Sequence, residues 1–232
     1  MNATSITRIA GLMGEAGRIQ MLAVLLDGNG HSASELAMAA AVSPQTASSH
    51  LSKLLSGGLI ISERNGRQRL FRLKNRDVAV AVEALGALAQ NSEPAAMPEL
   101  RFARTCYDHL GGVLAIAVRN ELLRQGAIRQ EREEFTVTPR GKHFLKSLQI
   151  EVEPLYRVRR SFAHKCLDWT ERHHHIGGAF GAALLSRFLE MKWLARIRNT
   201  RALRPTHAGQ RGFEQLFHVR FRELRSPAMI RE

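Results

Sequence analysis

The stretch from Ser43 to Gly58, SPQTASSHLSKLLSGG, limits the fold more than any other part of this 232-residue chain. Ser43 can cap the first turn of a helix, Pro44 suits its first position, and the glycines at 57 and 58 can end it. One face is apolar at spacings of three and four residues, at Ala47, Leu51, Leu54 and Leu55. The stretch therefore predicts one short amphipathic helix whose apolar face is buried.

The opposite face of this helix carries hydroxyl, amide and basic groups and no acid: Gln45, Thr46, Ser48, Ser49, His50, Ser52 and Lys53. Such side chains suit base edges and phosphates in a DNA major groove, whereas a merely solvated helix usually mixes Glu with Lys. Taken alone, this face leaves a solvated helix and a DNA-recognition helix equally open.

The segments on either side of the helix favour DNA recognition. A short helix that Ser34 can cap, SELAMAAAV, precedes it after a brief turn, which is the helix-turn-helix arrangement. Strand-like runs follow at 59–64 and 68–73, and the Asn65-Gly66 pair between them is a strong hairpin signal. Three arginines near the tip, Arg64, Arg67 and Arg69, predict a wing that contacts phosphates or the minor groove.

Residues 4–89 resemble the ArsR/SmtB family of winged-helix repressors, through SASELAMAAAVSPQTASSHLSKLLSGGLI, the Arg-Asn-Gly-Arg tip and LFRL. The resemblance implies a homodimer, with the first and last helices of the segment at its interface, on an inverted-repeat operator in double-stranded DNA. The candidate DNA contacts are Gln45, Thr46, Ser48, Ser49, His50, Lys53, Arg64, Arg67 and Arg69.

The chain departs from that family where its members bind metal. The helix from Ser34 has no thiol, and the helix expected over 76–89 has Asp77 and Glu83 but no His. Neither family metal site is carried over. A small-molecule or metal effector is therefore expected to act elsewhere.

Charge and composition divide the chain. The net charge of +13 and pI of about 11.0 favour a polyanion, nucleic acid before membrane. Residues 1–98 hold nine Lys/Arg and seven Asp/Glu (net +2), and residues 99–232 hold the other 25 and 14 (net +11). We predict a winged helix-turn-helix domain over 1–90, a polar linker over 91–98, and a sensory or clamping domain over 99–232. Two cysteines and the lack of a long apolar run favour the cytoplasm, away from membranes.

Residues 99–232 contain an internal repeat, at about 99–150 and 158–220. Phe102-Ala-Arg-Thr-Cys106 matches Phe162-Ala-His-Lys-Cys166, and both copies continue to an Asp, a Gly-Gly pair and a Thr-x-x-Gly. Each copy is expected to form a short helix, a Gly-Gly-initiated helix, a hairpin and a helix capped by Thr138 or Thr206. Halves of about 60 residues bury little core alone, so we predict a pseudo-symmetric pair of degenerate winged-helix-like units. The fold class is thus mainly α, an α+β winged helix followed by this pair.

The repeat supplies the sharpest candidate chemistry, a zinc-like transition metal site from Cys106, Asp108, His109, Cys166, Asp168 and His173, the last of these from the His run 173–175. Structural alternatives stay open: each Cys can be a small core residue on a helix face, each Asp a cap, and the His run 173–175 a solvated loop. A reversible Cys106–Cys166 disulfide is a further option.

No Walker loop, dinucleotide fingerprint or nucleophile elbow is present in the sequence, so we do not expect an enzyme. The expected function is a sequence-specific DNA-binding regulator, a dimeric repressor released by an effector. Two alternatives stay open: a metal- or thiol-redox-responsive protein using Cys106 and Cys166, and an architectural DNA-binding protein without an effector. Arginines near the two expected hairpin tips of residues 99–232 either extend the DNA contact or are solvated. The Gly-Gly helix starts either bind an anionic small molecule or allow close packing.

Overall fold

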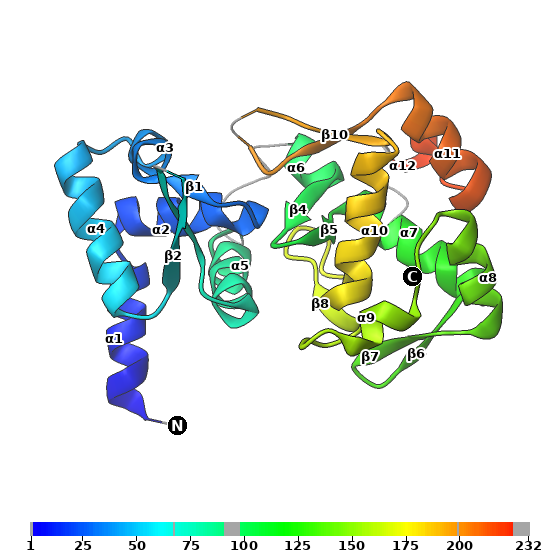
Figure 1. Cartoon of the computed structure of the whole chain (residues 1–232), viewed down its shortest axis with the longest axis horizontal. Coiled ribbons are helices and arrows are strands. Elements are labelled where there is room, and N and C mark those ends of the chain that lie inside the picture. Colours follow the sequence, from blue (N-terminus) through cyan, green and yellow to red (C-terminus); the bar gives the residue numbers. More distant parts are fainter. Residues whose placement is uncertain (1, 67, 91–97, 199, 225–232) are drawn as a thin grey trace. The chain divides into compact units, whose positions relative to one another are not determined.

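The computed structural model describes all residues except 1, 67, 91–97, 199 and 225–232, and the side chains of residues 87 and 90. The chain divides into two compact units, Met1–Ser92 and Glu93–Glu232 (Figure 1). Among the described residues no single helix is long and apolar enough to cross a membrane; one bent pair, Ala3–Met13 with Ala16–Asp27, passes by length and composition alone.

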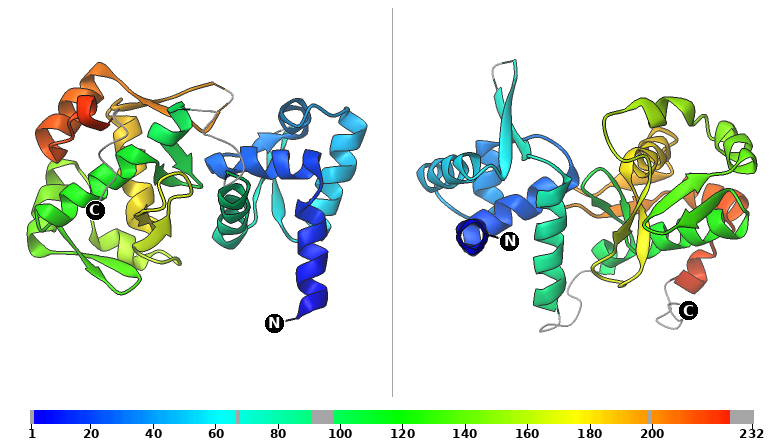
Figure 2. Two further views of the ribbon diagram at one scale, coloured as in Figure 1. Left: turned by 180° about the vertical axis from the view of Figure 1, so that it is seen from behind. Right: turned by 90° about the horizontal axis from the view of Figure 1, so that it is seen from below.

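The N-terminal unit is a winged helix. Its elements are α1 (Ala3–Met13), α2 (Ala16–Val24), a 3-10 turn (Leu25–Asp27), β1 (His31–Ser32), α3 (Ala33–Ala39), α4 (Pro44–Ser56), β2 (Ile60–Asn65), β3 (Gln68–Leu73) and α5 (Arg76–Gln90). The strands form one antiparallel sheet in the order β1-β3-β2. Figure 2 (right) shows the β2–β3 hairpin projecting from the unit. The predicted helix-turn-helix and hairpin are therefore both present.

Caps and core set the position of α4. Ser43 Oγ accepts a hydrogen bond from the Thr46 amide at 3.1 Å, as the sequence predicts. Leu51 and Leu54 are buried, whereas Leu55 is only partly so. The preceding helix begins two residues earlier than expected, because Ser32 rather than Ser34 is its N-cap. Glu35 lies three residues after Ser32, and the two form a reciprocal capping box.

The C-terminal unit repeats one order of elements, hairpin, helix, hairpin, helix. After α6 (Pro98–Phe102), the first copy is β4 (Arg104–Cys106), β5 (His109–Gly111), α7 (Val113–Arg124), β6 (Ile128–Glu131), β7 (Glu134–Val137) and α8 (Pro139–Ser147). After α9 (Glu153–Arg157), the second is β8 (His164–Leu167), β9 (His174–Gly177), α10 (Gly178–Glu190), β10 (Leu194–Arg196), β11 (Leu203–Pro205) and α11 (His207–Phe217), followed by α12 (Phe221–Leu224). Thr138 and Thr206 cap α8 and α11. The winged-helix fold class is confirmed.

The two copies interlock through their hairpins. β7 pairs with β8 at Glu134–His164, so the second hairpin of copy one extends the first hairpin of copy two in a sheet ordered β6-β7-β8-β9. The reciprocal contact is a single bridge, Arg104–Ala202, between the first hairpin of copy one and the second hairpin of copy two. Both copies also contribute to one apolar core, which includes Leu114 and Phe180. Sharing this core removes more apolar surface from water than either copy could remove alone.

The segment Phe102–Cys106 differs from expectation. It was predicted to be helical, with Phe and Cys on one face, but α6 ends at Phe102 and Cys106 lies on β4. The chain reverses through Tyr107, whose φ of 60° is left-handed, so Cys106 pairs directly with His109. A two-residue turn of this kind forms a hairpin.

The Gly-Gly pairs have a backbone role. Gly112 and Gly178 have φ values of 91° and 86°. A Cβ at Gly112 would lie 2.6 Å from the Arg101 carbonyl oxygen, and one at Gly178 would lie 2.7 Å from that of Phe162. Only glycine fits these equivalent positions, because both the conformation and the space exclude a side chain.

Candidate functional site

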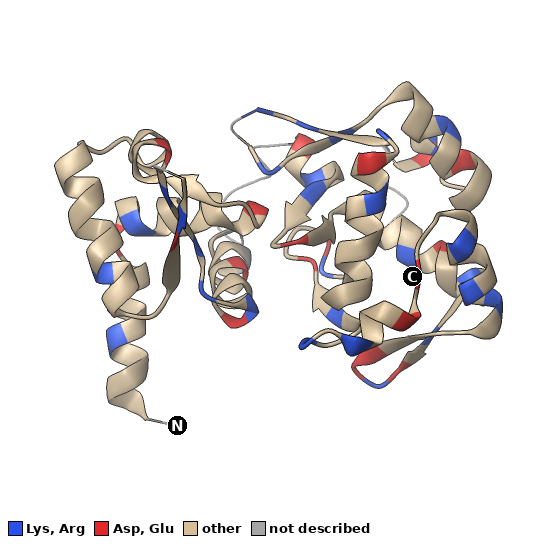
Figure 3. Cartoon of the chain, viewed as in Figure 1, with Lys and Arg blue, Asp and Glu red and all other residues tan. Residues whose placement is uncertain are grey.

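The outer face of α4 is exposed and free of acids. Gln45, Thr46, Ser48, Ser49 and Lys53 are all exposed. The sequence of α4 contains Lys53 and no acidic residue, and Figure 3 shows blue but no red on this helix. Because Pro44 and Ser43 fix the first turn, Gln45 and Thr46 are held at the N-terminal end of the helix, the part that contacts bases in helix-turn-helix proteins.

The β2–β3 hairpin adds basic groups beside this helix. Arg64 and Arg69 face each other across the two strands, and both are exposed. The Arg69 guanidinium donates to Ser62 Oγ at 2.8 Å and lies 5.2 Å from the centroid of the Phe71 ring. These contacts orient Arg69 along the hairpin. Arg67 lies outside the described residues.

His50 does not belong to the exposed face. Its residue is only 8% exposed, and its Nε2 lies 3.3 Å from Glu15 Oε2. Glu15 in turn caps α2 by accepting from the amides of Gly17 and Arg18. Placing His50 among the base contacts is a correction to the sequence analysis. Positions 47, 50, 51 and 54 form one buried helical stripe, a spacing that could have identified it.

A second polar group lies deep in the C-terminal unit. One ligand atom each of Cys106, His109, Cys166 and His175 lies within 4.8 Å of the others, and all four residues are buried. The two Sγ atoms are 3.8 Å apart, and the two imidazole Nε2 atoms are 3.1 Å apart. We refer to these four residues as the Cys2His2 cluster.

Two hairpins build the Cys2His2 cluster in the same way. On each hairpin the Cys lies on the first strand and the His lies directly opposite on the second: Cys106 with His109, and Cys166 with His175. Side chains of a directly opposite pair project on one face of a hairpin. Each repeat thus supplies one thiol and one imidazole.

Carboxylates stand behind both imidazoles. Asp108 Oδ1 lies 3.4 Å from His109 Nδ1, and Asp168 Oδ2 lies 3.2 Å from His175 Nδ1. Asp168 also lies 2.9 Å from the buried Arg104 guanidinium and accepts from the Gly112 amide at 2.6 Å. These Asp side chains therefore orient the rings and link the two repeats.

Neighbouring groups shift the pKa values of the two imidazoles and of Asp168 in opposite directions. Burial alone would lower the pKa of His175, but Asp168 and the Cys106 sulfur outweigh burial and raise it to about 9. The pKa of His109 is also raised, since the influence of Cys106 and Asp108 exceeds the opposing effect of burial. Burial would raise the pKa of Asp168, yet His175 and Arg104 hold it well below its usual range.

The sequence-predicted metal ligands divide into three groups. The structure brings Cys106, His109 and Cys166 together; it places Asp108 and Asp168 behind the histidines; and it puts His173 elsewhere. His173 lines a pocket of about 250 Å³ with Val113 and Arg119.

The sequence analysis takes the wrong histidine from the run 173–175, because it names His173 as the ligand and the structure places His175 in the cluster. The signal was present, because His175 precedes Gly177-Gly178 by the spacing that separates His109 from Gly111-Gly112.

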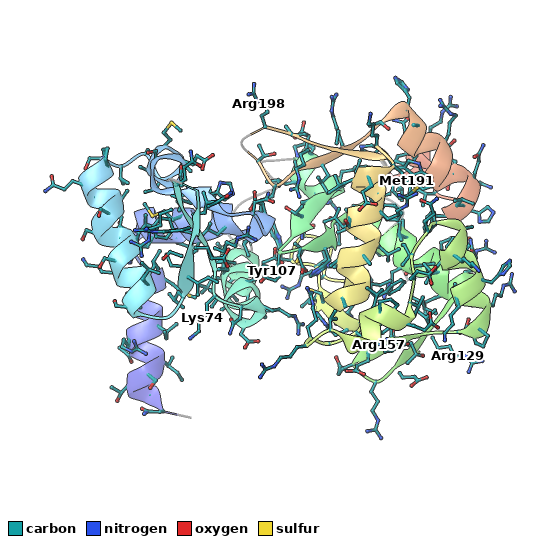
Figure 4. All side chains as sticks on the ribbon, viewed as in Figure 1. Lys74, Tyr107, Arg129, Arg157, Met191 and Arg198 are labelled. Atoms are coloured by element: carbon teal, nitrogen blue, oxygen red, sulfur yellow. The ribbon has the colours of Figure 1, made fainter. Side chains whose placement is uncertain are left out.

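The second hairpins of the two repeats carry exposed arginines. Arg129 and Arg132 lie on the β6–β7 hairpin, and Arg196 and Arg198 lie on or next to β10. Figure 4 shows Arg198 pointing away from its hairpin. These exposed arginines make the surface of the second hairpin of each repeat basic.

The comparisons with known proteins agree with the winged helix. No family model matches the sequence. The chain is 42% identical over 222 residues to an uncharacterized HTH-type transcriptional regulator, YdfF, of Bacillus subtilis strain 168, covering 93% of this chain and 98% of that protein.

Two solved structures are similar over the N-terminal part alone. One is the homodimeric winged helix-turn-helix DNA-binding domain of a possible ArsR-family regulator from Mycobacterium bovis, 26% identical, covering 39% of this chain and 82% of that one, with a TM-score of 0.36. The other is reduced HlyU from Vibrio cholerae, 24% identical, covering 40% and 94%, with a TM-score of 0.35.

Identity of 42% over nearly the whole of both chains extends beyond the winged helix into the repeated unit. The ArsR/SmtB pattern of residues 4–89 also indicates a transcriptional regulator. The chain therefore belongs to the family of HTH-type transcriptional regulators, with a winged-helix DNA-binding fold at its N-terminal end.

Proposed function

We propose that this regulator is a dimeric, sequence-specific repressor that binds an inverted-repeat operator and is released by an effector. The observation that carries the proposal is the exposed, acid-free face of α4 beside the arginines of the β2–β3 hairpin. In this arrangement α4 supplies base contacts and the hairpin supplies phosphate contacts. A protein with two thiols suits a reducing compartment, so we propose the cytoplasm.

An exposed apolar face on α5 supports the dimer. Val80, Leu85 and Leu88 are 45%, 43% and 66% exposed, and Ile6 on α1 is 50% exposed. Exposed large apolar side chains on these two helices favour burial against a second copy. Size-exclusion chromatography with light scattering should give twice the mass of one chain, and Leu88→Asp should shift the protein to monomer. A monomeric wild-type protein at micromolar concentration would reject the dimer.

Sequence discrimination tests the role of α4. Operator fragments from the protein's own upstream DNA are titrated by fluorescence anisotropy against a scrambled duplex of equal length. Gln45→Ala should reduce the ratio of the two affinities by more than about tenfold, since in a dimer it removes two base contacts and each contributes roughly 1–3 kcal/mol of discrimination. Equal affinity of the wild type for both duplexes would favour the architectural alternative.

Salt dependence tests the role of the hairpin. Arg64→Ala should weaken binding to both duplexes alike. In a dimer it removes two phosphate contacts, so the slope of log affinity against log salt should fall by about 1.8. Arg220→Ala is the matched control, because Arg220 is exposed and pairs with Glu223 on α12. No binding to any duplex at low salt would overturn the proposal.

We place the effector site in residues 99–232. The pocket beside α7 suits a small molecule, and its volume is about 250 Å³. The second candidate is an effector that acts on Cys106 and Cys166, because their sulfur atoms lie 3.8 Å apart. Footprinting with and without metals, oxidant and reductant separates the two: an unchanged footprint under all of these conditions would exclude the thiol route.

A further inference from the structure

The spacing of the Cys2His2 cluster matches a common ion. Two sulfurs each about 2.3 Å from a tetrahedral zinc ion lie roughly 3.8 Å apart, and two imidazole nitrogens at about 2.0 Å lie roughly 3.3 Å apart. The observed separations are 3.8 Å for Cys106 and Cys166 and 3.1 Å for His109 and His175. The S–S and N–N edges of the cluster therefore agree with a tetrahedron, and the four S–N separations are no longer than 4.8 Å.

The orientation of the imidazoles also indicates a cation. Each Nδ1 faces a carboxylate, Asp108 for His109 and Asp168 for His175, which favours a proton on Nδ1. The two Nε2 atoms lie 3.1 Å apart in a buried site. With Nδ1 protonated, each Nε2 can offer its lone pair to a metal ion. A metal ion satisfies both lone pairs at once.

We propose that Cys106, His109, Cys166 and His175 bind one zinc-type divalent ion, which fastens the β4–β5 hairpin to the β8–β9 hairpin. A tetrahedral S2N2 set is typical of zinc. On binding, both thiols release their protons to solvent, and the two thiolates balance the charge of the ion. Asp108 and Asp168 hold the imidazoles in the ligating tautomer. All four positions are filled by protein and are buried, which is the pattern of a structural rather than a catalytic zinc site.

A disulfide accounts for less of the geometry. It needs the sulfurs to close from 3.8 Å to about 2.05 Å and leaves the facing histidines unexplained. The proposal concerns the C-terminal unit alone and does not depend on operator binding.

Metal content and cobalt spectroscopy test the proposal on the full-length protein. The reduced, chelator-treated wild type should bind about one equivalent of Co²⁺ and show thiolate-to-cobalt charge transfer with the strong visible bands of a tetrahedral site. Protein produced with added zinc should retain about one zinc per chain after gel filtration. His173→Gln is the matched control and should keep the full spectrum, because His173 neighbours the cluster in sequence but lies in the pocket beside α7.

Ligand variants provide the contrast. Cys106→Ser should reduce the charge-transfer band to about half or less, because only the Cys166 thiolate remains, and His175→Gln should bind Co²⁺ at least tenfold more weakly. Should either variant fail to fold, the wild-type titration alone decides. No cobalt band in the reduced wild type, or an unchanged band in Cys106→Ser, would overturn the site. Operator affinity of the same samples is measured separately. A protein that retains the metal but does not bind DNA would contradict the proposed repressor function and leave the proposed metal site supported.

Discussion

The buried pair Arg104–Asp168 gives the sharpest prediction about stability. Both side chains are 0% exposed, with 2.9 Å between Arg104 Nη2 and Asp168 Oδ1. Asp168→Asn keeps the shape but removes the charge, so the buried Arg104 guanidinium loses its ion pair with Asp168. Breaking a buried pair in this way costs about 3–5 kcal/mol. That is a large share of the roughly 5–15 kcal/mol that stabilises a typical domain.

The internal repeat provides a matched control for this change. Asp108 is the equivalent carboxylate, but it pairs with Arg160, and the two side chains are 28% and 37% exposed. Water reaches both groups in part, so Asp108→Asn should cost less than Asp168→Asn, about 1–2 kcal/mol. Adding Arg104→Leu to Asp168→Asn removes the buried cation, and the double variant should lose less stability than the sum of the single changes.

Urea unfolding followed by tryptophan fluorescence measures these differences. The chain has two tryptophans, Trp169 and Trp193, and both lie in the C-terminal unit. The signal therefore reports that unit without interference from the winged helix. Chelator is present throughout, so metal affinity does not enter. Equal losses for Asp168→Asn and Asp108→Asn, with unchanged urea dependence, would refute the reasoning.

Three further predictions concern other parts of the chain. By the same fluorescence assay, Gly178→Ala should cost more than about 3 kcal/mol, whereas Gly126→Ala, at φ 67° with open space around it, should cost about 1–2. Asp27 raises the pKa of His31 by a hydrogen bond, so this pair stabilises the fold fully below about pH 6.5, and the contribution is lost as pH rises through the raised pKa. The difference in unfolding free energy between wild type and His31→Gln, followed by circular dichroism because the winged helix has no tryptophan, should shrink over that interval. A pH-independent difference would contradict this prediction. His50→Asn should lower the free energy of unfolding of the winged helix by about 1–2 kcal/mol without changing operator discrimination. A change in discrimination with unchanged stability would indicate that His50 contacts DNA.

The winged helix could be predicted because its signals are local. Ser43, Pro44 and the Asn65-Gly66 turn each act within a few residues of where they stand, and the structure places a cap, a helix start and a hairpin there. The internal repeat was also visible in the sequence, since Gly112 and Gly178 occupy positions that only glycine fits.

The remaining features depend on contacts between distant residues. Cys106 was assigned to a helix because Phe102 stands four residues earlier, but pairing with His109 and the bridge from Arg104 to Ala202 make this segment a strand. Pairing across nearly a hundred residues leaves no periodic trace in so short a run. The choice of His173 over His175 within the run 173–175 was wrong for the same reason: the role of His175 depends on facing His109 from the other repeat.

The division of the Cys2His2 cluster between two repeats indicates how such a site can arise in evolution. One repeat as a separate subunit would carry half of it, a thiol and an imidazole, and would complete it only by meeting another copy at sufficient concentration. Joining the copies in one chain makes that encounter intramolecular, at an effective concentration independent of how much protein the cell holds. It also frees the halves to diverge. Arg104 now stands where the second copy has His164, and the second copy carries six extra residues before its Gly-Gly pair.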